Sequence, residues 1–228
     1  MFITTRSVAV EKFARVWKRY SFTVLFAFLV GGIFDPRIAL GAVICMVGPL
    51  VVAPFRGRIW CGAVCPRGSF FDTVVARFGR GKAPPAFFRS YSFRALVIAC
   101  MAAVLTVGIA RSDGSASAVG FVFYRLVALT TVVGVVLAFF FNHRSWCSFC
   151  PMGTIASLIV RLGTRGGKGD KPMKGRLRVA QACISCSLCQ KRCPLGLDPR
   201  AYRGGVLSHP DCVQCGVCAA ACPVKAIG

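Results

Sequence analysis

The sequence predicts a mostly α-helical membrane protein, with four transmembrane helices in two repeated pairs and a small C-terminal α+β domain. Three observations lead to this fold class. The chain of 228 residues is 56% hydrophobic, which exceeds the apolar content of an ordinary soluble domain. It contains four long apolar stretches that short polar or basic links separate. Its last residues carry eight cysteines whose spacing occurs twice.

The four apolar stretches cover residues 21–34, 38–55, 95–110 and 120–141. A transmembrane helix needs about 20 apolar residues. The first stretch is short, so we expect it to extend back toward Val16, with Lys18 and Arg19 reaching to the membrane interface. A cleaved signal peptide is the alternative for this stretch. Asp35-Pro36-Arg37 predicts a tight turn between the first two spans.

The positive charges predict the orientation of these spans. The chain has 29 Lys and Arg residues against 7 Asp and Glu residues. They concentrate in residues 1–20, 56–94 and beyond 161, which four spans place on one side of the membrane. Cytoplasmic loops carry this excess, so we expect a multi-pass protein of the bacterial inner membrane with both termini in the cytoplasm. Charges that flank apolar segments argue against nucleic acid as a partner.

Two cysteine runs near the C-terminus carry the most specific chemical signal. Each run has the spacing Cys-x-x-Cys-x-x-Cys-x-x-x-Cys-Pro, which is the ligand pattern of a bacterial two-cluster ferredoxin. Three cysteines of each run bind one cubane, and the cysteine before proline binds the other. The first [4Fe-4S] cluster is therefore expected on Cys183, Cys186, Cys189 and Cys222, and the second on Cys212, Cys215, Cys218 and Cys193. Zinc and disulfides are the alternatives, but neither requires this repeated order.

The membrane segments contain a second repeat. Trp60-Cys61-x-x-x-Cys65-Pro66 follows the second span, and Trp146-Cys147-x-x-Cys150-Pro151 follows the fourth. We call these segments the Cys-Pro elbows. Each unit of two spans, an elbow and an interfacial helix occurs twice, which suggests a pseudo-two-fold axis along the membrane normal. The four elbow thiols could converge on a further iron–sulfur cluster or another soft metal, act as redox thiols, or serve as structural corners.

These features predict four regions. Residues 1–20 form a basic cytoplasmic segment, 21–163 a four-span membrane domain with two elbows, 164–178 a basic linker, and 179–228 a ferredoxin-like domain with two clusters. The spans hold no histidine, so b-type haem is excluded. Tyr124 and Arg125 lie near the outer end of the fourth span, where they either bind a quinone head group or reach the interface. Cys45 and Cys100 are expected to pack within the spans.

The ordered combination of four spans, two Cys-Pro elbows and paired ferredoxin motifs resembles the NapH-type membrane ferredoxins, with relatives of the NosR and CcoG types. This resemblance implies a membrane component of a quinol dehydrogenase that passes electrons between quinol and an iron–sulfur or cytochrome partner. Two alternatives are a CcoG-like maturation factor that reduces a metal, and a redox-sensing assembly or regulatory protein. The second elbow is one residue shorter than the Cys-x-x-x-Cys-Pro of that family, and the outer link at residues 35–37 is also shorter.

Overall fold

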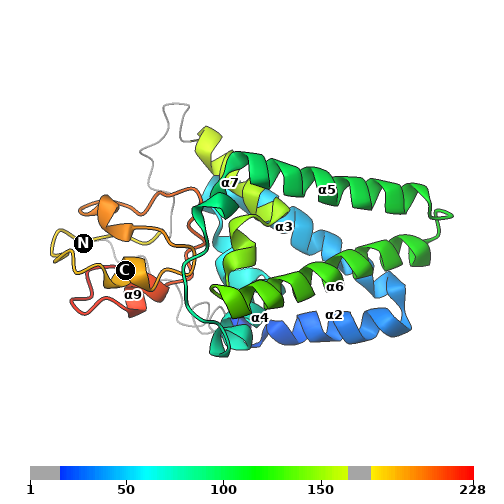
Figure 1. The fold of residues 1–228 in the computed structure, drawn as a ribbon, viewed down its shortest axis with the longest axis horizontal. Helices are drawn as coiled ribbons and strands as arrows, with labels where there is room; N and C mark the ends of the chain where they lie inside the picture. The colour runs from blue at the N-terminus through cyan, green and yellow to red at the C-terminus, as the bar shows by residue number, and fades with distance from the viewer. Residues whose placement is uncertain (1–15, 164–175) are drawn as a thin grey trace.

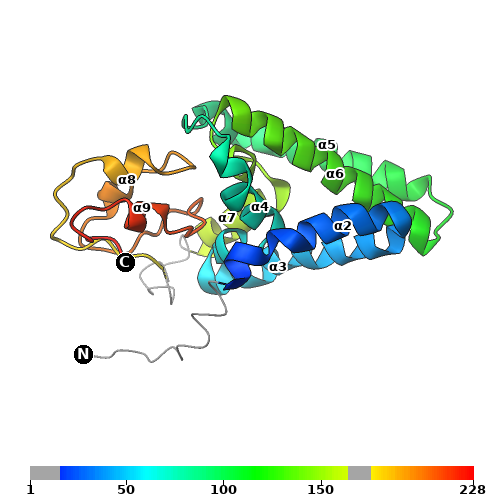
Figure 2. The same cartoon turned by 90° about the horizontal axis from the view of Figure 1, so that it is seen from below.

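The computed structural model describes residues 16–163 and 176–228. The expected basic N-terminal segment and the expected linker therefore lie largely outside the described residues. Figure 1 shows a bundle of long helices at one end and a C-terminal unit with little regular structure at the other. A layer of short helices lies between these two parts, and Figure 2 shows the same order from a second side.

Among residues 16–163 and 176–228, three apolar helices are long enough to cross a membrane, which is consistent with membrane association. The first comprises the 3-10 helix η1 (Pro36–Gly41) and the helix α3 (Ala42–Arg56). The other two are α5 (Tyr91–Ala110) and α6 (Ala116–Phe140). The expected first span is the shorter helix α2 (Phe22–Phe34), although residues 16–20 before it are helical as well. In the described residues, three of the four expected spans are long enough to cross a membrane, and the expected count of four is not confirmed.

Polar side chains set where these helices begin. The hydroxyl of Ser90 accepts a hydrogen bond from the amide of Phe93 at the start of α5. Ser115 caps α6 in the same way through the amide of Ala118. Asp35 accepts from the amide of Arg37, and the chain after it continues as η1. The expected tight turn is thus the start of a 3-10 helix, because Asp35 and Pro36 together favour such a start.

Glycines let the helices α2 and α6 approach their neighbours closely. A Cβ at Gly120 would lie 2.1 Å from the carbonyl oxygen of Pro36, so only glycine fits at this contact. A Cβ at Gly32 would lie 2.5 Å from the ring of Tyr124, which also stacks on Phe28. The ring of Tyr124 therefore packs within the helix bundle, and the quinone role considered for it gains no support.

The short helices form two equivalent sets after the second and fourth apolar stretches. The first set is η2 (Trp60–Val64, a π-helical turn), α4 (Pro66–Thr73) and η3 (Val75–Arg77). The second set is η5 (Ser145–Ser148) and α7 (Pro151–Gly163). The helix α4 packs against α2, while α7 packs against α3 and α5. The connection between the sets contains η4 (Ala86–Arg89).

The C-terminal unit contains almost no sheet, so the α+β expectation is not confirmed. Its helices are α8 (Leu188–Lys191), the 3-10 helix η7 (Pro199–Tyr202) and α9 (Val217–Ala220). In the described residues, strand pairing is limited to isolated bridges of Val179 with Arg203 and Ile227, and of Arg178 with Val206. The cysteine loops occupy most of this short unit, which leaves extended segments too short for ladders.

Candidate functional site

The four cysteines predicted for the second cluster line a single cavity in the C-terminal unit. The cavity is small, with a volume of about 20 Å³. Its walls carry apolar side chains such as Leu195, Leu207 and Val213, together with the four thiols of Cys193, Cys212, Cys215 and Cys218. Apolar walls that converge four thiols fit an iron–sulfur cluster, which binds through thiolates and is sensitive to solvent.

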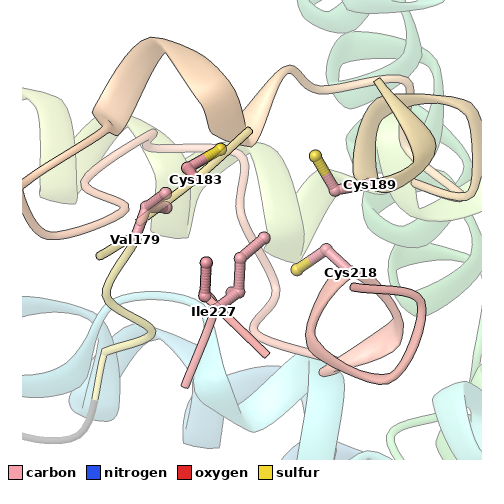
Figure 3. Packing of buried hydrophobic residues seen from close by; sticks show 6 residues of the cluster. Val179, Cys183, Cys189, Cys218 and Ile227 are labelled. Carbon is pink, nitrogen blue, oxygen red and sulfur yellow. The ribbon is translucent and has the colours of Figure 1, made fainter. Parts of the chain in front are cut away.

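The cysteines predicted for the first cluster gather around a neighbouring apolar cluster. Cys183 and Cys189 are buried there against Ile227, and Cys222 packs on it. Figure 3 shows the sulfur atoms of Cys183 and Cys189 pointing toward one another. Cys186 lies at the surface of the unit. The structure thus brings three of these four residues into one apolar region and leaves the fourth at its exposed edge.

Cys218 belongs to both surroundings. It is buried in the apolar cluster around Cys183 and Cys189, and it also lines the cavity of the second set. Its position indicates that the two cysteine sets are adjacent within the unit.

The backbone repeats itself around the two sets. Left-handed φ angles occur at three pairs of equivalent positions, which are Ser185 with Gln214, Ser187 with Gly216, and Gly196 with Lys225. Non-glycine residues rarely adopt this conformation, and it persists where function requires it. In the described chain, all four non-glycine residues with positive φ lie in these loops. The duplicated cysteine motif therefore has a duplicated, strained backbone that wraps each set of thiols.

Burial disfavours the thiolate form of these cysteines in the absence of a metal. It raises the pKa of Cys212 to about 11 and the pKa of Cys218 to about 12. Both are therefore neutral at pH 7, and coordination to a metal must release their protons. Among the described residues, no three His, Cys, Asp or Glu side chains are placed to hold a single ion. A cubane spreads its four thiolates over four iron atoms, so it does not require that convergence.

The two Cys-Pro elbows reach the same local geometry with different spacings. In the first elbow, the amide of Cys65 donates to the carbonyl of Trp60 across a π-helical turn. In the second elbow, the amide of Cys150 donates to the carbonyl of Trp146 across one residue fewer. Each second cysteine is thus fixed to the tryptophan that precedes the first cysteine. The wider turn absorbs the extra residue of the first elbow.

Two equivalent arginines join the elbows reciprocally. The guanidinium of Arg58 donates to the carbonyl of Cys147 at 2.8 Å, and that of Arg144 donates to the carbonyl of Cys61 at 2.9 Å. Both arginine side chains are buried. Their carbonyl acceptors are the first cysteines of the opposite elbow, so this exchange supports the predicted pseudo-two-fold relation and brings the two elbows into direct contact.

Equivalent glycines make room for these arginines. A Cβ at Gly153 would lie 2.2 Å from the guanidinium of Arg58. A Cβ at Gly68 would lie 2.6 Å from the carbonyl oxygen of Cys61, the acceptor of Arg144. Gly68 and Gly153 occupy the same position in the two repeats, two residues after the elbow proline. The repeat therefore preserves the space that the reciprocal contacts need.

Carboxylates neutralise part of this buried positive charge. Arg144 forms two hydrogen bonds with Asp72, at 2.7 and 2.6 Å. Burial opposes ionisation of Asp72, but the hydrogen bonds from Arg144 and His143 outweigh it and hold the pKa of this carboxyl well below its ordinary value. Asp211 of the C-terminal unit pairs with Arg58 and, through two bonds of 3.0 Å, with Arg94.

The four elbow thiols lie close to one another in a basic, donor-rich environment. Burial, with a smaller contribution from neighbouring elbow thiols, raises the pKa of Cys61, Cys65 and Cys147 to about 11. Each of these three thiols interacts electrostatically with Cys150. The elbow cysteines are therefore electrostatic neighbours, although they come from segments more than eighty residues apart.

Arg67 places a further positive charge beside these thiols. Its guanidinium stacks on the ring of Trp146 at 4.7 Å and donates to the carbonyl of Thr130. Burial lowers the pKa of Arg67, and the thiols of Cys150, Cys65 and Cys147 oppose that effect. In the described part of the chain no carboxylate pairs with Arg67 in a salt bridge. A buried guanidinium requires an anion nearby, and the elbow cysteines are the residues that can supply it.

Several buried donors in the elbows also lack a partner within the protein. Six such atoms are present among the described elbow residues: Nε of Arg58 and Arg67, Nε1 of Trp60 and Trp146, and the hydroxyl oxygens of Ser148 and Thr154. Buried donors without partners are rare and call for an explanation. Three buried arginines, Arg58, Arg94 and Arg144, and the partly buried Arg67 face two carboxylates. This excess of positive charge and donors fits an anionic thiolate cluster better than four neutral thiols.

The C-terminal unit docks directly on the elbows. Cys61 and Cys147 pack in the same apolar cluster as Cys193, Cys212 and Cys215. A Cβ at Gly62 would lie 1.9 Å from the carbonyl oxygen of Val213, so the second cysteine loop rests on the first elbow without a gap. The cysteines predicted for the second cluster are therefore the ones nearest the membrane helices.

Sequence reasoning missed the charged residues of this interface. Arg58, Arg67, Arg144, Asp72 and Asp211 contact the elbow cysteines or join the two parts of the molecule. One signal was present, because Arg58 and Arg144 occupy the same position before the two Trp-Cys pairs. The other was the scarcity of acid, since Asp72 and Asp211 are two of only seven acidic residues in the chain.

Comparison with family models identifies iron–sulfur domains in both parts. A 4Fe-4S binding domain matches residues 38–84 and again residues 124–168, which contain the two elbows. A 4Fe-4S dicluster domain matches residues 182–227. The protein is therefore an iron–sulfur protein, and its apolar helices are consistent with membrane association.

Two relatives are similar over most of the chain. The uncharacterized protein MJ0749 of Methanocaldococcus jannaschii is 26% identical over 165 residues, which are 68% of this chain and 59% of the relative. The uncharacterized protein MJ0750 of the same organism is 24% identical over 76% of this chain and 78% of its own length. The chain thus spans less than two thirds of the first of these relatives. No solved structure matches the chain.

Proposed function

We propose that this protein is a membrane-anchored electron carrier with three iron–sulfur centres in series. Cys183, Cys186, Cys189 and Cys222 hold the first [4Fe-4S] cluster, and Cys212, Cys215, Cys218 and Cys193 hold the second. Cys61, Cys65, Cys147 and Cys150 hold the third, the elbow centre, which the two repeats share. These clusters accept and release single electrons.

The observation that carries this proposal is the apolar cluster that joins the two parts. Cys61 and Cys147 of the elbows and Cys193, Cys212 and Cys215 of the C-terminal unit pack around Leu195, Leu197 and Val213. Electron transfer needs adjacent centres and a surrounding that excludes water, and this shared core provides both. The protein's residues hold the centres in order, from the unit's exposed edge at Cys186 to the elbows above the helices.

The buried charges suit the elbow centre to carry negative charge. Arg58, Arg67 and Arg144 surround the four thiols, and their guanidinium groups favour thiolate over thiol. The orphan donors of the elbows can donate to thiolate or bridging sulfur, which tunes the potential of such a centre. An iron–sulfur centre at this site is thus favoured over redox thiols or a purely structural corner.

The helices suggest the partner on the membrane side. The expected topology, with four spans and both termini in the cytoplasm of a bacterial cell, is retained as part of this proposal, with α2 extended by residues 16–20 as the fourth span. The partner in the membrane is a quinone, which can exchange one or two electrons. The resemblance to NapH-type proteins implies this partner. An iron–sulfur protein or a cytochrome is the expected soluble partner.

The covered position of the elbows separates electron transfer from the maturation alternative. A factor that reduces a metal or thiol of another protein must expose its reactive cysteines. Here the carbonyl of Val213 lies against Gly62, and Arg58 of the elbow is fixed to Asp211 above it. An internal relay is consistent with this burial, so we favour it over a metal-reducing or redox-sensing role.

Iron content tests the proposal. Protein purified anaerobically is expected to hold about twelve iron atoms per chain, from three cubanes of four. The double variant Cys61→Ser/Cys147→Ser should lose about four of them while the ferredoxin-type signals remain in the electron paramagnetic resonance spectrum. The variant Cys100→Ser is the control, because Cys100 is exposed and lies in the helix α5. An unchanged iron content in the elbow variant would remove the third centre from the proposal.

A further inference from the structure

The two cysteine loops of the C-terminal unit are related by the internal repeat, but only one of them is covered. The second loop, residues 211–216, rests on the elbows: Val213 is 1% exposed, Gln214 donates to the carbonyl of Arg56, and the carbonyl of Cys215 accepts from Lys18. In the first loop, residues 182–187, Ile184 is 62% exposed. Ile184 is the repeat equivalent of Val213, so a surface that is buried in one repeat is free in the other.

The free loop lies at the end of the molecule opposite to the membrane helices. In both views, the yellow segment that leads into α8 is farthest from α2, α3, α5 and α6 (Figures 1 and 2). Cys186, which is predicted to bind the first cluster, is exposed within this loop. Leu188 adds a second apolar side chain, 41% exposed, next to Ile184. The distal surface therefore combines exposed apolar side chains with the expected entry point for an electron.

The charges around the two loops differ. The second loop begins with Asp211, which meets the elbow arginines Arg58 and Arg94. The equivalent residue before the first loop is Ala182. Lys191 and Arg192, both exposed, lie at the C-terminal end of α8, where the second repeat has Ala220 and Ala221. The other carboxylate of the described unit, Asp198, pairs with Arg200. The distal repeat thus carries two basic residues where the covered repeat has alanines, and it lacks the carboxylate with which the covered repeat begins.

From this inverted symmetry we propose that the distal surface, made of Ile184, Cys186, Leu188, Lys191 and Arg192, docks a soluble one-electron carrier with an acidic face. The inference rests on the proposed electron-transfer function and names its partner class. The covered loop shows how such a surface binds: an apolar residue enters the interface, and one carboxylate meets two basic side chains. At the distal surface the basic side chains belong to this chain, so the carboxylates belong to the carrier.

One electron leaves the reduced carrier and enters the cluster that Cys186 helps to bind, so the carrier is oxidised by one electron. No bond to carbon or hydrogen is broken. The exposed position of Cys186 keeps the path between the two redox groups short. Lys191 and Arg192 attract the acidic face at long range, which raises the association rate, while Ile184 and Leu188 exclude water from the contact.

Stopped-flow reduction of the full-length protein tests this surface. The protein is incorporated in nanodiscs of neutral lipid, and reduced flavodoxin serves as a small acidic one-electron carrier. The variant Lys191→Glu/Arg192→Glu is expected to slow reduction about tenfold or more at low salt, and added salt should erase the difference. The control Arg178→Glu/Lys225→Glu changes charge equally at residues that line a separate cavity, and it should be nearly as fast as the native protein.

Three outcomes would overturn the inference. They are equal rates for the two double variants, faster reduction by basic cytochrome c than by flavodoxin, and a rate that depends on anionic lipid in the nanodisc. The last result would mean that the basic residues bind the membrane surface. Reduction by dithionite is measured in parallel. If dithionite does not reduce the native protein, the proposed electron-transfer function itself is contradicted.

Discussion

The two Cys-Pro elbows differ in the origin of the carboxylate that their arginine meets. Arg144 of the second elbow pairs with Asp72, which belongs to the helix α4 of the first repeat. The symmetric partner of Arg58 would be Ser157 in α7, since residue 157 is the repeat equivalent of residue 72. Ser157 carries no charge, and Arg58 pairs instead with Asp211 of the C-terminal unit.

This difference shows how an internal repeat can be adapted to bind a third part of the chain. The carboxylate of Asp72 pairs with an arginine of the same membrane domain. The carboxylate of Asp211 comes instead from the C-terminal unit that docks on this domain. The arginine of the first elbow thereby forms an ion pair with the docked unit, while that of the second forms its ion pair within the membrane domain. The same adaptation separates the two cysteine loops, of which one is covered and one is exposed.

The largest effect is expected from removing the carboxylate of the internal pair. The change Asp72→Asn leaves the guanidinium of Arg144, whose side chain is 0% exposed, without its counter-charge. Breaking a buried ion pair on one side costs about 3–5 kcal/mol of stability. Thermal unfolding of the protein in nanodiscs measures this loss. The change Asp211→Asn is the comparison: it should release the C-terminal unit to proteolysis while the membrane helices unfold as in the native protein.

The pH dependence of that loss has a defined sign. The pKa of Asp72 is lowered by folding, so its contribution is present above the unfolded pKa of about 3.9 and is lost as pH falls through the folded pKa. The stability difference between the native protein and Asp72→Asn should be constant above about pH 5 and shrink below about pH 4. A difference that grows on acidification would contradict the assignment of this pair.

A smaller effect is expected at the glycines that admit the reciprocal arginines. A Cβ at Gly68 meets a backbone oxygen, whereas one at Gly153 meets the end of a side chain that can move. Gly68→Ala should therefore cost about 1–3 kcal/mol, and Gly153→Ala less. Thermal unfolding gives the order, and Gly163→Ala is a control because a Cβ there meets no atom within 4 Å. The reverse order would mean that Arg58, not the elbow backbone, limits the packing.

The smallest effect concerns the elbow arginine that the repeat does not duplicate. Position 67 is arginine in the first repeat, and its equivalent in the second is Met152. The change Arg67→Met removes a positive charge beside Cys65, Cys147 and Cys150, so the elbow centre should become harder to reduce. We expect at least a tenfold change in the reduction equilibrium, which is ~59 mV for one electron.

A redox titration followed by electron paramagnetic resonance measures this midpoint. The variant Arg67→Lys keeps the charge and should stay close to the native value. An unchanged midpoint in Arg67→Met would show that the guanidinium stabilises the fold through Trp146 rather than the reduced centre.

Sequence patterns predicted correctly those elements that a single contiguous stretch of residues defines. Apolar length located α3, α5 and α6 to within a few residues, and the Cys-Pro spacing located both elbows and the helices after them. The cavity around Cys193, Cys212, Cys215 and Cys218 combines the cysteines that the motif assigns to the second cluster, although their binding of that cluster stays a prediction.

Contacts between distant segments could not be predicted. No pattern joins Arg58 to Cys147 or Asp211, because these contacts depend on how two repeats and a third unit face each other. The π-helical turn at Trp60 could not be predicted either. The extra residue between Cys61 and Cys65 suggested that the two elbows differ in geometry, and only the structure shows that this turn accommodates it. The expected sheet failed for a related reason: the pattern of cysteines does not show how little extended chain remains between them.

The reciprocal hydrogen bonds of the elbows have a consequence for biogenesis. While the ribosome is still making the second half, Arg58 of the first half has neither the carbonyl of Cys147 nor the carboxylate of Asp211 available. The first elbow therefore stays open until residue 211 has been synthesised. The complete set of contacts at the first elbow therefore forms only after nearly the whole polypeptide has been made.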